Sequence, residues 1–138
     1  MIGSRRRRGA RGQAGPSEFI FSANTVTTSA TARYLPSGYT MGTAPTTSVP
    51  VTFNGTRVFT TIRYRARLAG SGSGSIVFTV RKEGVGTLLT LTVLLTATSG
   101  VFVLPAGVSF AAGEALDVEV TKTGTVTTSP TDLSVTIS

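Results

Sequence analysis

The sequence predicts an all-β protein, an antiparallel β-sandwich of about eight strands preceded by an N-terminal arm. Apolar residues alternate with polar ones over many short segments, which is the two-residue period of strands with one buried face. Glycine-containing turns separate these segments, and no segment of useful length shows the helical period. Threonine, which is β-branched and suits a half-exposed pleated surface, is abundant. Short strands at this spacing indicate a two-sheet sandwich or a barrel.

Length and composition limit the classes of function. The 138 residues suffice for one domain with a core, and they are too few for two. Cysteine and histidine are both absent, which removes disulfides, thiol nucleophiles, zinc sites and histidine-based acid–base chemistry. We therefore expect no cofactor, no metal and no catalytic site. Charged residues make up only 14% of the chain, so we expect a surface that is largely neutral or covered by partners.

The positive charge is concentrated in an arm formed by residues 1–16. The formal net charge is +7, and residues 17–138 contribute only eight basic and six acidic residues to it. Like charges and glycines give the arm nothing to bury, so it is expected to be disordered alone or extended on a partner. That partner could be the acidic surface of a neighbouring protein or nucleic acid. The arginines that carry this prediction are Arg5, Arg6, Arg7, Arg8 and Arg11.

Nothing in the sequence suggests a membrane protein. No apolar run reaches the roughly 18–20 residues of a membrane span. The basic N-terminus lacks the apolar segment that follows it in a secretory signal.

The folded domain is predicted to cover residues 17–138. Its first strand is expected within Ser17–Asn24, where Phe19 and Phe21 share a face, and a polar strand continues through Thr25–Leu35. A long aperiodic loop follows at Pro36–Pro50, and loops of this length often bind something.

Three strands in the middle of the sequence are predicted to form an antiparallel meander. They cover Arg57–Leu68, Ile76–Arg81 and Leu88–Leu95. The turns between them are Gly70–Gly74 and Glu83–Gly86, both short and rich in glycine.

The remaining strands follow at similar spacing. Val101–Leu104 precedes a turn at Pro105–Gly107, and Val108–Phe110 is expected to be a short edge segment. Ala115–Thr121 alternates apolar with polar residues. The last strand comes after a polar loop, and its buried face is formed by Leu133, Val135 and Ile137.

The acidic residues do not form a convincing catalytic site. Asp117 and Glu119 share one strand face and could resemble the carboxylate pair of a glycoside hydrolase, or could bind calcium with a loop carbonyl. We expect them to be solvated or paired with basic residues, as exposed acids usually are. The protein is therefore predicted not to be an enzyme.

Three arginines alternate along the first strand of the predicted meander. Arg63, Arg65 and Arg67 lie on one face about 6.6–6.8 Å apart, and Tyr64 faces the other way. They could form a cross-strand ladder with Asp117 and Glu119, contact an acidic surface of a neighbouring subunit, or bind nucleic-acid phosphate. The missing aromatic residue on their face weakens the last alternative.

Two longer runs carry a resemblance to a known group of proteins. Ser75–Val93 and Ala111–Val120 resemble jelly-roll domains of tailed-bacteriophage virion proteins in their strand–turn spacing, an Arg-Lys-x-Gly turn and an Ala-Gly-Glu-x-Leu segment. The group includes capsid decoration (cement) proteins, head fibres and tail-fibre tips, many of them trimers. The resemblance covers residues 50–138 and implies a jelly roll that assembles as a homotrimer.

The resemblance implies a virion protein assembled in the host cytoplasm. We expect a capsid decoration protein that binds the major capsid protein or other virion proteins, with the arm as an anchor. One alternative is a head- or tail-fibre receptor-binding domain that uses Pro36–Pro50, Tyr34 and Tyr39 to bind a glycan. Another is the jelly-roll coat protein of a small virus whose arm binds the genome.

Overall fold

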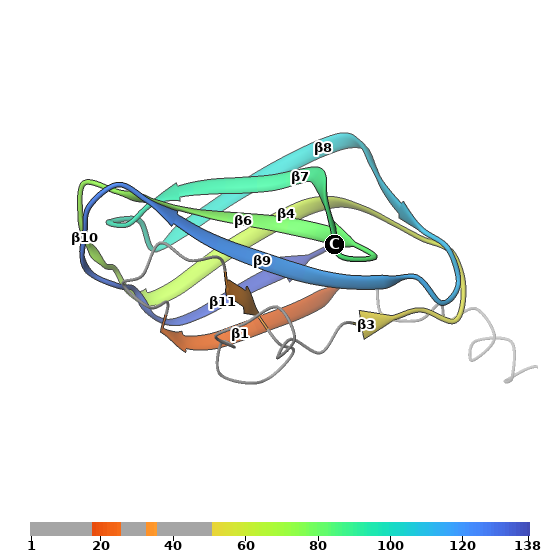
Figure 1. Ribbon diagram of the computed structural model, residues 1–138, viewed down its shortest axis with the longest axis horizontal. Coiled ribbons are helices and arrows are strands. Elements are labelled where there is room, and N and C mark those ends of the chain that lie inside the picture. The colour runs from red at the N-terminus through yellow and green to blue at the C-terminus, as the bar shows by residue number, and fades with distance from the viewer. Residues whose placement is uncertain (1–17, 26–32, 36–50) are drawn as a thin grey trace, which may run out of the picture.

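The computed structural model describes residues 18–25, 33–35 and 51–138, which form two antiparallel β-sheets packed face to face (Figure 1). The first sheet has the order β1-β11-β4-β8, with β1 (Phe19–Thr25), β11 (Thr131–Ile137), β4 (Arg57–Leu68) and β8 (Ser99–Phe110). The second has the order β2-β9-β6-β7, with β2 (Arg33–Leu35), β9 (Ala115–Thr123), β6 (Ser75–Lys82) and β7 (Val85–Leu94). The short strand β3 (Val51–Thr52) also pairs with β9, and β5 (Ser71–Gly72) pairs with β10 (Val126–Thr128).

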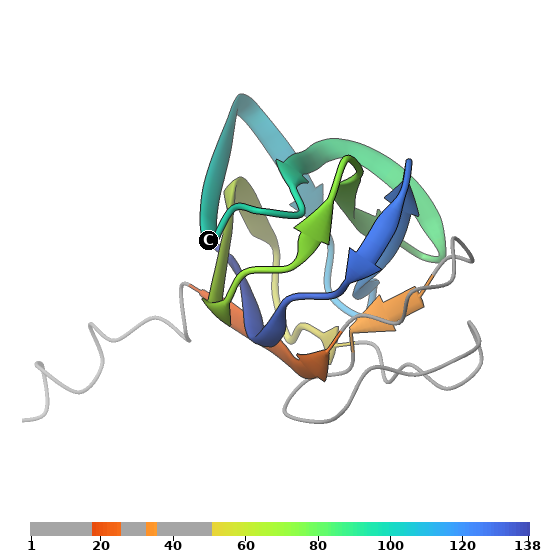
Figure 2. The ribbon, with the colours of Figure 1, turned by 90° about the vertical axis from the view of Figure 1, so that its left-hand side faces the viewer.

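The order of the strands makes the sandwich a jelly roll. Strands that follow one another in sequence mostly lie in opposite sheets, and the β6–β7 hairpin is the main local pairing. Figure 2, which looks along the strands, shows the resulting two layers. The four strands of the first sheet face β2, β9, β6 and β7 of the five-stranded second sheet, and eight strands that cross in this way are the arrangement of a jelly roll. The predicted all-β antiparallel sandwich is therefore confirmed.

The core lies between the two sheets and is built from the inward-facing residues of each strand. The predicted alternation is confirmed in β6, β9 and β11, and in β7 from Leu89 onward, because apolar side chains at alternate positions are buried there. The largest of the fully buried side chains are Phe21, Phe59, Ile62, Tyr64, Ile76, Phe78, Leu89, Leu95, Phe110, Leu116 and Leu133.

The predicted meander is wrong. β4 lies in the first sheet between β11 and β8, whereas β6 and β7 lie in the second sheet. The segment between β4 and β6 is a crossover at the end of the sandwich, where β5 pairs with β10. A Cβ at Gly74 would collide with the carbonyl oxygen of Thr123, so this crossover packs against the next turn and is no loose hairpin loop.

A bulge interrupts the alternation in β4. Phe59 and Ile62 both face the core although they are three residues apart. The extra residue is accommodated because the amides of Thr60 and Thr61 both donate to the carbonyl of Ser138, at 2.9 Å each. The pairing with β8 also shifts at this point, so the turn predicted at Pro105–Gly107 is an irregularity inside one long strand.

Some predictions fall partly or wholly outside the described residues. The first strand is confirmed as β1, and the last three residues of the polar strand predicted at Thr25–Leu35 form β2. Residues 26–32, the loop at 36–50 and the arm at 1–16 lie outside the described part of the chain.

Candidate protein-interaction surface

The arginine row lies on the outer face of the first sheet. β4 occupies an inner position of this sheet, with β11 on one side and β8 on the other. Arg63, Arg65 and Arg67 are exposed, and Tyr64 between them is buried in the core against Phe78, with ring centroids 5.1 Å apart. The predicted strand face of each side chain is confirmed.

The predicted ladder between these arginines and the acids of β9 is wrong. Asp117 and Glu119 belong to β9 in the second sheet, so they do not pair with β4. In the register of that sheet Asp117 lies opposite Arg81 and Glu119 opposite Thr79. The sequence pattern gave the correct face within each strand but no information about which strands are neighbours.

Asp117 is bound by a residue that the sequence analysis did not single out. Arg81 Nε donates to Asp117 Oδ1 at 2.7 Å, and Arg81 Nη2 donates to Oδ2 at 2.6 Å. Only 7% of Asp117 is exposed, although it lies on the outer face of β9. This bidentate pair occupies both carboxylate oxygens, so Asp117 is a structural residue in this fold.

Two further acidic residues, Asp132 and Glu114, also pair with basic residues. Arg67 Nε donates to Asp132 Oδ2 at 2.6 Å, with 71% and 48% of the two side chains exposed. Lys82 Nζ lies 3.1 Å from Glu114 Oε2. The amide of Ala111 donates to the same carboxylate, and this hydrogen bond, followed by that from Lys82, lowers the pKa of Glu114.

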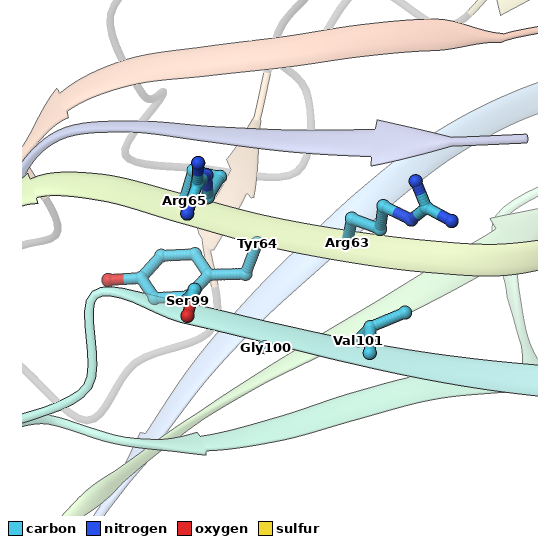
Figure 3. A pocket seen from close by; sticks show the side chains of 6 residues that line it. All are labelled: Arg63, Tyr64, Arg65, Ser99, Gly100 and Val101. Atoms are coloured by element: carbon cyan, nitrogen blue, oxygen red, sulfur yellow. The ribbon is translucent and has the colours of Figure 1, made fainter.

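A shallow hollow lies between β4 and β8, beside the arginine row. It is open to solvent, with a volume of about 370 Å³, and is lined by Arg63, Tyr64, Arg65, Ser99, Gly100 and Val101. Figure 3 shows the two arginines and the Tyr64 ring on opposite sides of the β4 ribbon, with Ser99 and Val101 extending from β8. Burial raises the pKa of Tyr64 to about 12, and its hydroxyl has no hydrogen-bond partner among the described residues.

β8 presents an uncovered apolar edge. It is the last strand of the first sheet, and 58% of Val101 and 54% of Val103 are exposed. The amide of Ala66 on β4 donates to the carbonyl of Thr98 at 2.9 Å. In an antiparallel ladder, residue pairs that are hydrogen-bonded to each other alternate with pairs that are not. The backbone groups of Ser99, Val101 and Val103 therefore point away from β4, toward the open edge. Further large apolar side chains are exposed on β7, namely Val85, Leu88 and Leu94.

Neither a metal-binding cluster nor a membrane-spanning helix is found within residues 18–25, 33–35 and 51–138. No three Asp, Glu, His or Cys side chains are grouped there so that they could hold a metal ion. No helix in these segments is long and apolar enough to cross a membrane. The arm arginines Arg5, Arg6, Arg7, Arg8 and Arg11 lie outside the described residues.

No protein-family model and no curated protein matches the chain.

Proposed function

We propose that the protein is a non-enzymatic structural component of a virus particle, and specifically a capsid decoration protein. The observation that carries the proposal is a low-charge jelly roll with an uncovered apolar edge at β8. The resemblance of residues 50–138 to jelly-roll proteins of tailed-phage virions supplies the class. The jelly roll is also a common architecture of viral capsid domains.

The β8 edge supports a protein that acts within an assembly. A free strand edge with exposed apolar side chains tends to pair with another chain, and monomeric proteins commonly protect such edges with charges. The segment Ser99–Leu104 carries no charged residue, and Val101 and Val103 are exposed on it. Covering β8 and the apolar side chains of β7 would stabilise an oligomer, which we propose to be a homotrimer.

The arm would provide attachment to the shell. Its five arginines are the strongest concentration of charge in the chain, and residues 17–138 carry a net charge of only +2. We propose that the arm extends onto acidic surfaces of the major capsid protein in the virion. Its role would be mechanical, because each contact across neighbouring shell subunits adds free energy that opposes their separation.

Removal of the arm tests the proposed attachment. The full-length protein should occupy shells purified from the virus that carries its gene, and a variant lacking residues 1–16 should occupy few of them while melting at the same temperature. Sedimentation with shells and thermal melting measure the two properties. Equal occupancy by both forms would refute the anchoring role.

The proposed oligomer is tested at the β8 edge. Val101→Lys and Val103→Lys each place a charge where the edge would be covered, and both should lower the mass measured by light scattering to that of a monomer. Ile20→Lys is the matched control, since Ile20 is also 54% exposed but lies on β1 at the opposite edge of the same sheet. An unchanged oligomer in both β8 variants would exclude this edge as the interface.

A second candidate is the coat protein of a small virus, with the arm bound to the genome. The jelly-roll strand order favours it, because single jelly rolls are frequent in viral shells. The ultraviolet spectrum of the purified protein separates the two candidates. The chain has no tryptophan and only three tyrosines, so bound nucleic acid would dominate its absorbance. Closed particles that contain nucleic acid would favour the coat protein, and a small particle free of nucleic acid would favour decoration.

A further inference from the structure

Two arginines on the outer face of the first sheet lack a counterion within the described structure. Arg63 lies opposite Thr136 on β11 and Val101 on β8, and Arg65 lies opposite Ser134 and Ser99. All four cross-strand neighbours are neutral. Neither arginine forms an ion pair or side-chain hydrogen bond with a described residue.

Three other basic residues of the sandwich have acidic partners. Arg67, Arg81 and Lys82 form ion pairs with Asp132, Asp117 and Glu114 respectively. Half of the six acids in the chain are thus engaged in these pairs, and none of the three reaches Arg63 or Arg65. Among the described residues of this outer face, Arg63 and Arg65 are the basic residues without an ion pair, and both lie beside the hollow between β4 and β8.

We propose that Arg63 and Arg65 form a binding site for an extended acidic segment of a partner protein, with carboxylates at alternate positions. Alternate residues of one strand are about 6.6–6.8 Å apart, so residues two apart in an extended segment have the same spacing as the backbone positions of Arg63 and Arg65. Arginine suits this role because its planar fork can bind a carboxylate through two hydrogen bonds.

The neighbouring side chains complete the site. The hydroxyl groups of Ser99 and Ser134 lie on either side of Arg65 in the register and can donate to carboxylate oxygens. Thr136 lies opposite Arg63 on β11, on the side away from the β8 edge, and its hydroxyl group can also donate to a carboxylate oxygen. Arginine is enriched and lysine is depleted in protein interfaces, which also favours a protein partner for this pair.

The same face is poorly suited to single-stranded nucleic acid. Proteins that bind single strands place aromatic side chains where bases can stack on them. Tyr64, the aromatic residue within the arginine row, is fully buried against Phe78. The lining of the hollow contains no other aromatic residue.

This inference deepens the proposed function and rests on it for the identity of the partner, which would be another protein of the particle. The site itself can be tested without shells. The probes are a short peptide in which glutamate alternates with threonine, a peptide of the same composition with its glutamates consecutive, and a short oligodeoxythymidine.

The test uses the full-length protein and its Arg63→Gln/Arg65→Gln variant. The arm arginines are present in both, so binding at the site is read from the amide resonances of Ser99, Gly100 and Val101 in a titration followed by NMR. The alternating peptide should shift these resonances, and the double variant should weaken that interaction about tenfold, as expected for the loss of two exposed charge pairs. The consecutive peptide should bind this site more weakly than the alternating one.

Arg67→Gln is the matched control. Arg67 lies on the same strand and face, but its guanidinium is already bound to Asp132, so the substitution removes the same charge and should leave the affinity nearly unchanged. The proposal would be overturned if Arg67→Gln lost as much affinity for the peptide as the double variant does. It would also be overturned if both peptides bound equally, or if neither shifted the resonances of these amides. Stronger shifts with the oligonucleotide than with the peptide would also overturn it and assign the site to nucleic acid. Failure of the full-length protein to occupy purified shells would refute the proposed function alone.

Discussion

Arg81 on β6 holds Asp117 on β9 through two hydrogen bonds, Nε to Oδ1 at 2.7 Å and Nη2 to Oδ2 at 2.6 Å. The pair joins two neighbouring strands of the second sheet on its outer face, where 13% and 9% of the two side chains are exposed. The third guanidinium nitrogen, Nη1, donates to the carbonyl of Gly84 at 3.1 Å. The pair therefore also ties the β6–β7 turn to the sheet.

Asp117→Ala should destabilise the protein strongly. It leaves the largely buried guanidinium of Arg81 without its counterion, and breaking such a pair costs about 3–5 kcal/mol. Chemical denaturation monitored by circular dichroism measures the free energy of unfolding. Arg67→Gln breaks an exposed ion pair that is held by a single hydrogen bond, and it should cost less than about 1 kcal/mol. Equal costs for the two variants would show that burial does not govern the contribution of the Arg81–Asp117 pair.

Tyr64 should make the protein sensitive to alkaline pH. Burial raises the pKa of its hydroxyl to about 12, from 10.0 in an exposed tyrosine. The unfolded chain therefore loses this proton first as the pH rises above 10, and stability falls by about 1.4 kcal/mol per pH unit until the folded state also titrates.

Tyr64→Phe should remove this contribution. The hydroxyl has no hydrogen-bond partner among the described residues, so at neutral pH its loss should be neutral or slightly stabilising. The difference in unfolding free energy between the variant and the natural sequence, measured from pH 7 to 12, should widen above pH 10. A constant difference would show that Tyr64 does not titrate on unfolding.

Glu114 should contribute to stability above its lowered pKa. The amide of Ala111 and then Lys82 lower the pKa of its carboxyl from the ordinary value of 4.5. As the pH falls below 4.5 the unfolded chain takes up the proton first, so the stabilisation is lost as the pH falls through the folded-state pKa. Glu114→Gln should show a shallower loss of stability in this range, measured by thermal melting. If Glu114→Gln and the natural sequence lost stability equally as the pH falls below 4.5, Glu114 would not be the source of this pH dependence.

Gly100→Ala should destabilise the protein through a single contact. Gly100 lies opposite Tyr64, and a Cβ at this position would collide with Cγ1 of Val93 on β7. Overpacking of this kind costs typically about 1–3 kcal/mol. Gly55→Ala is the control, because no atom lies within 4 Å of a Cβ built there, and it should leave stability nearly unchanged.

A second substitution tests the cause. Val93→Ala removes the methyl group in conflict, so the double variant with Gly100→Ala should be more stable than the sum of the two single effects predicts. Strict additivity in denaturation experiments would place the cost of Gly100→Ala elsewhere.

The alternation of side chains was predictable within each strand, because the side-chain direction has a period of two wherever the backbone is extended. The sequence alone thus determined the all-β class, the buried faces of β6, β7, β9 and β11, and the exposure of Arg63 and Arg65 on the face opposite Tyr64. These properties depend only on local residue order. The absence of cysteine and histidine likewise excluded whole classes of chemistry without any knowledge of the fold.

Only the tertiary structure decided which strands are neighbours. The local pattern favoured a meander of consecutive strands, but β4 pairs with β11, which begins more than sixty residues later in the chain, as the separation of 65 between Arg67 and Asp132 shows. Alternation is the same for any partner, so it could not show that Asp117 meets Arg81 or that Arg63 and Arg65 have only neutral neighbours. Those relationships follow from the register between distant strands, which is fixed by burying both sheets against one core.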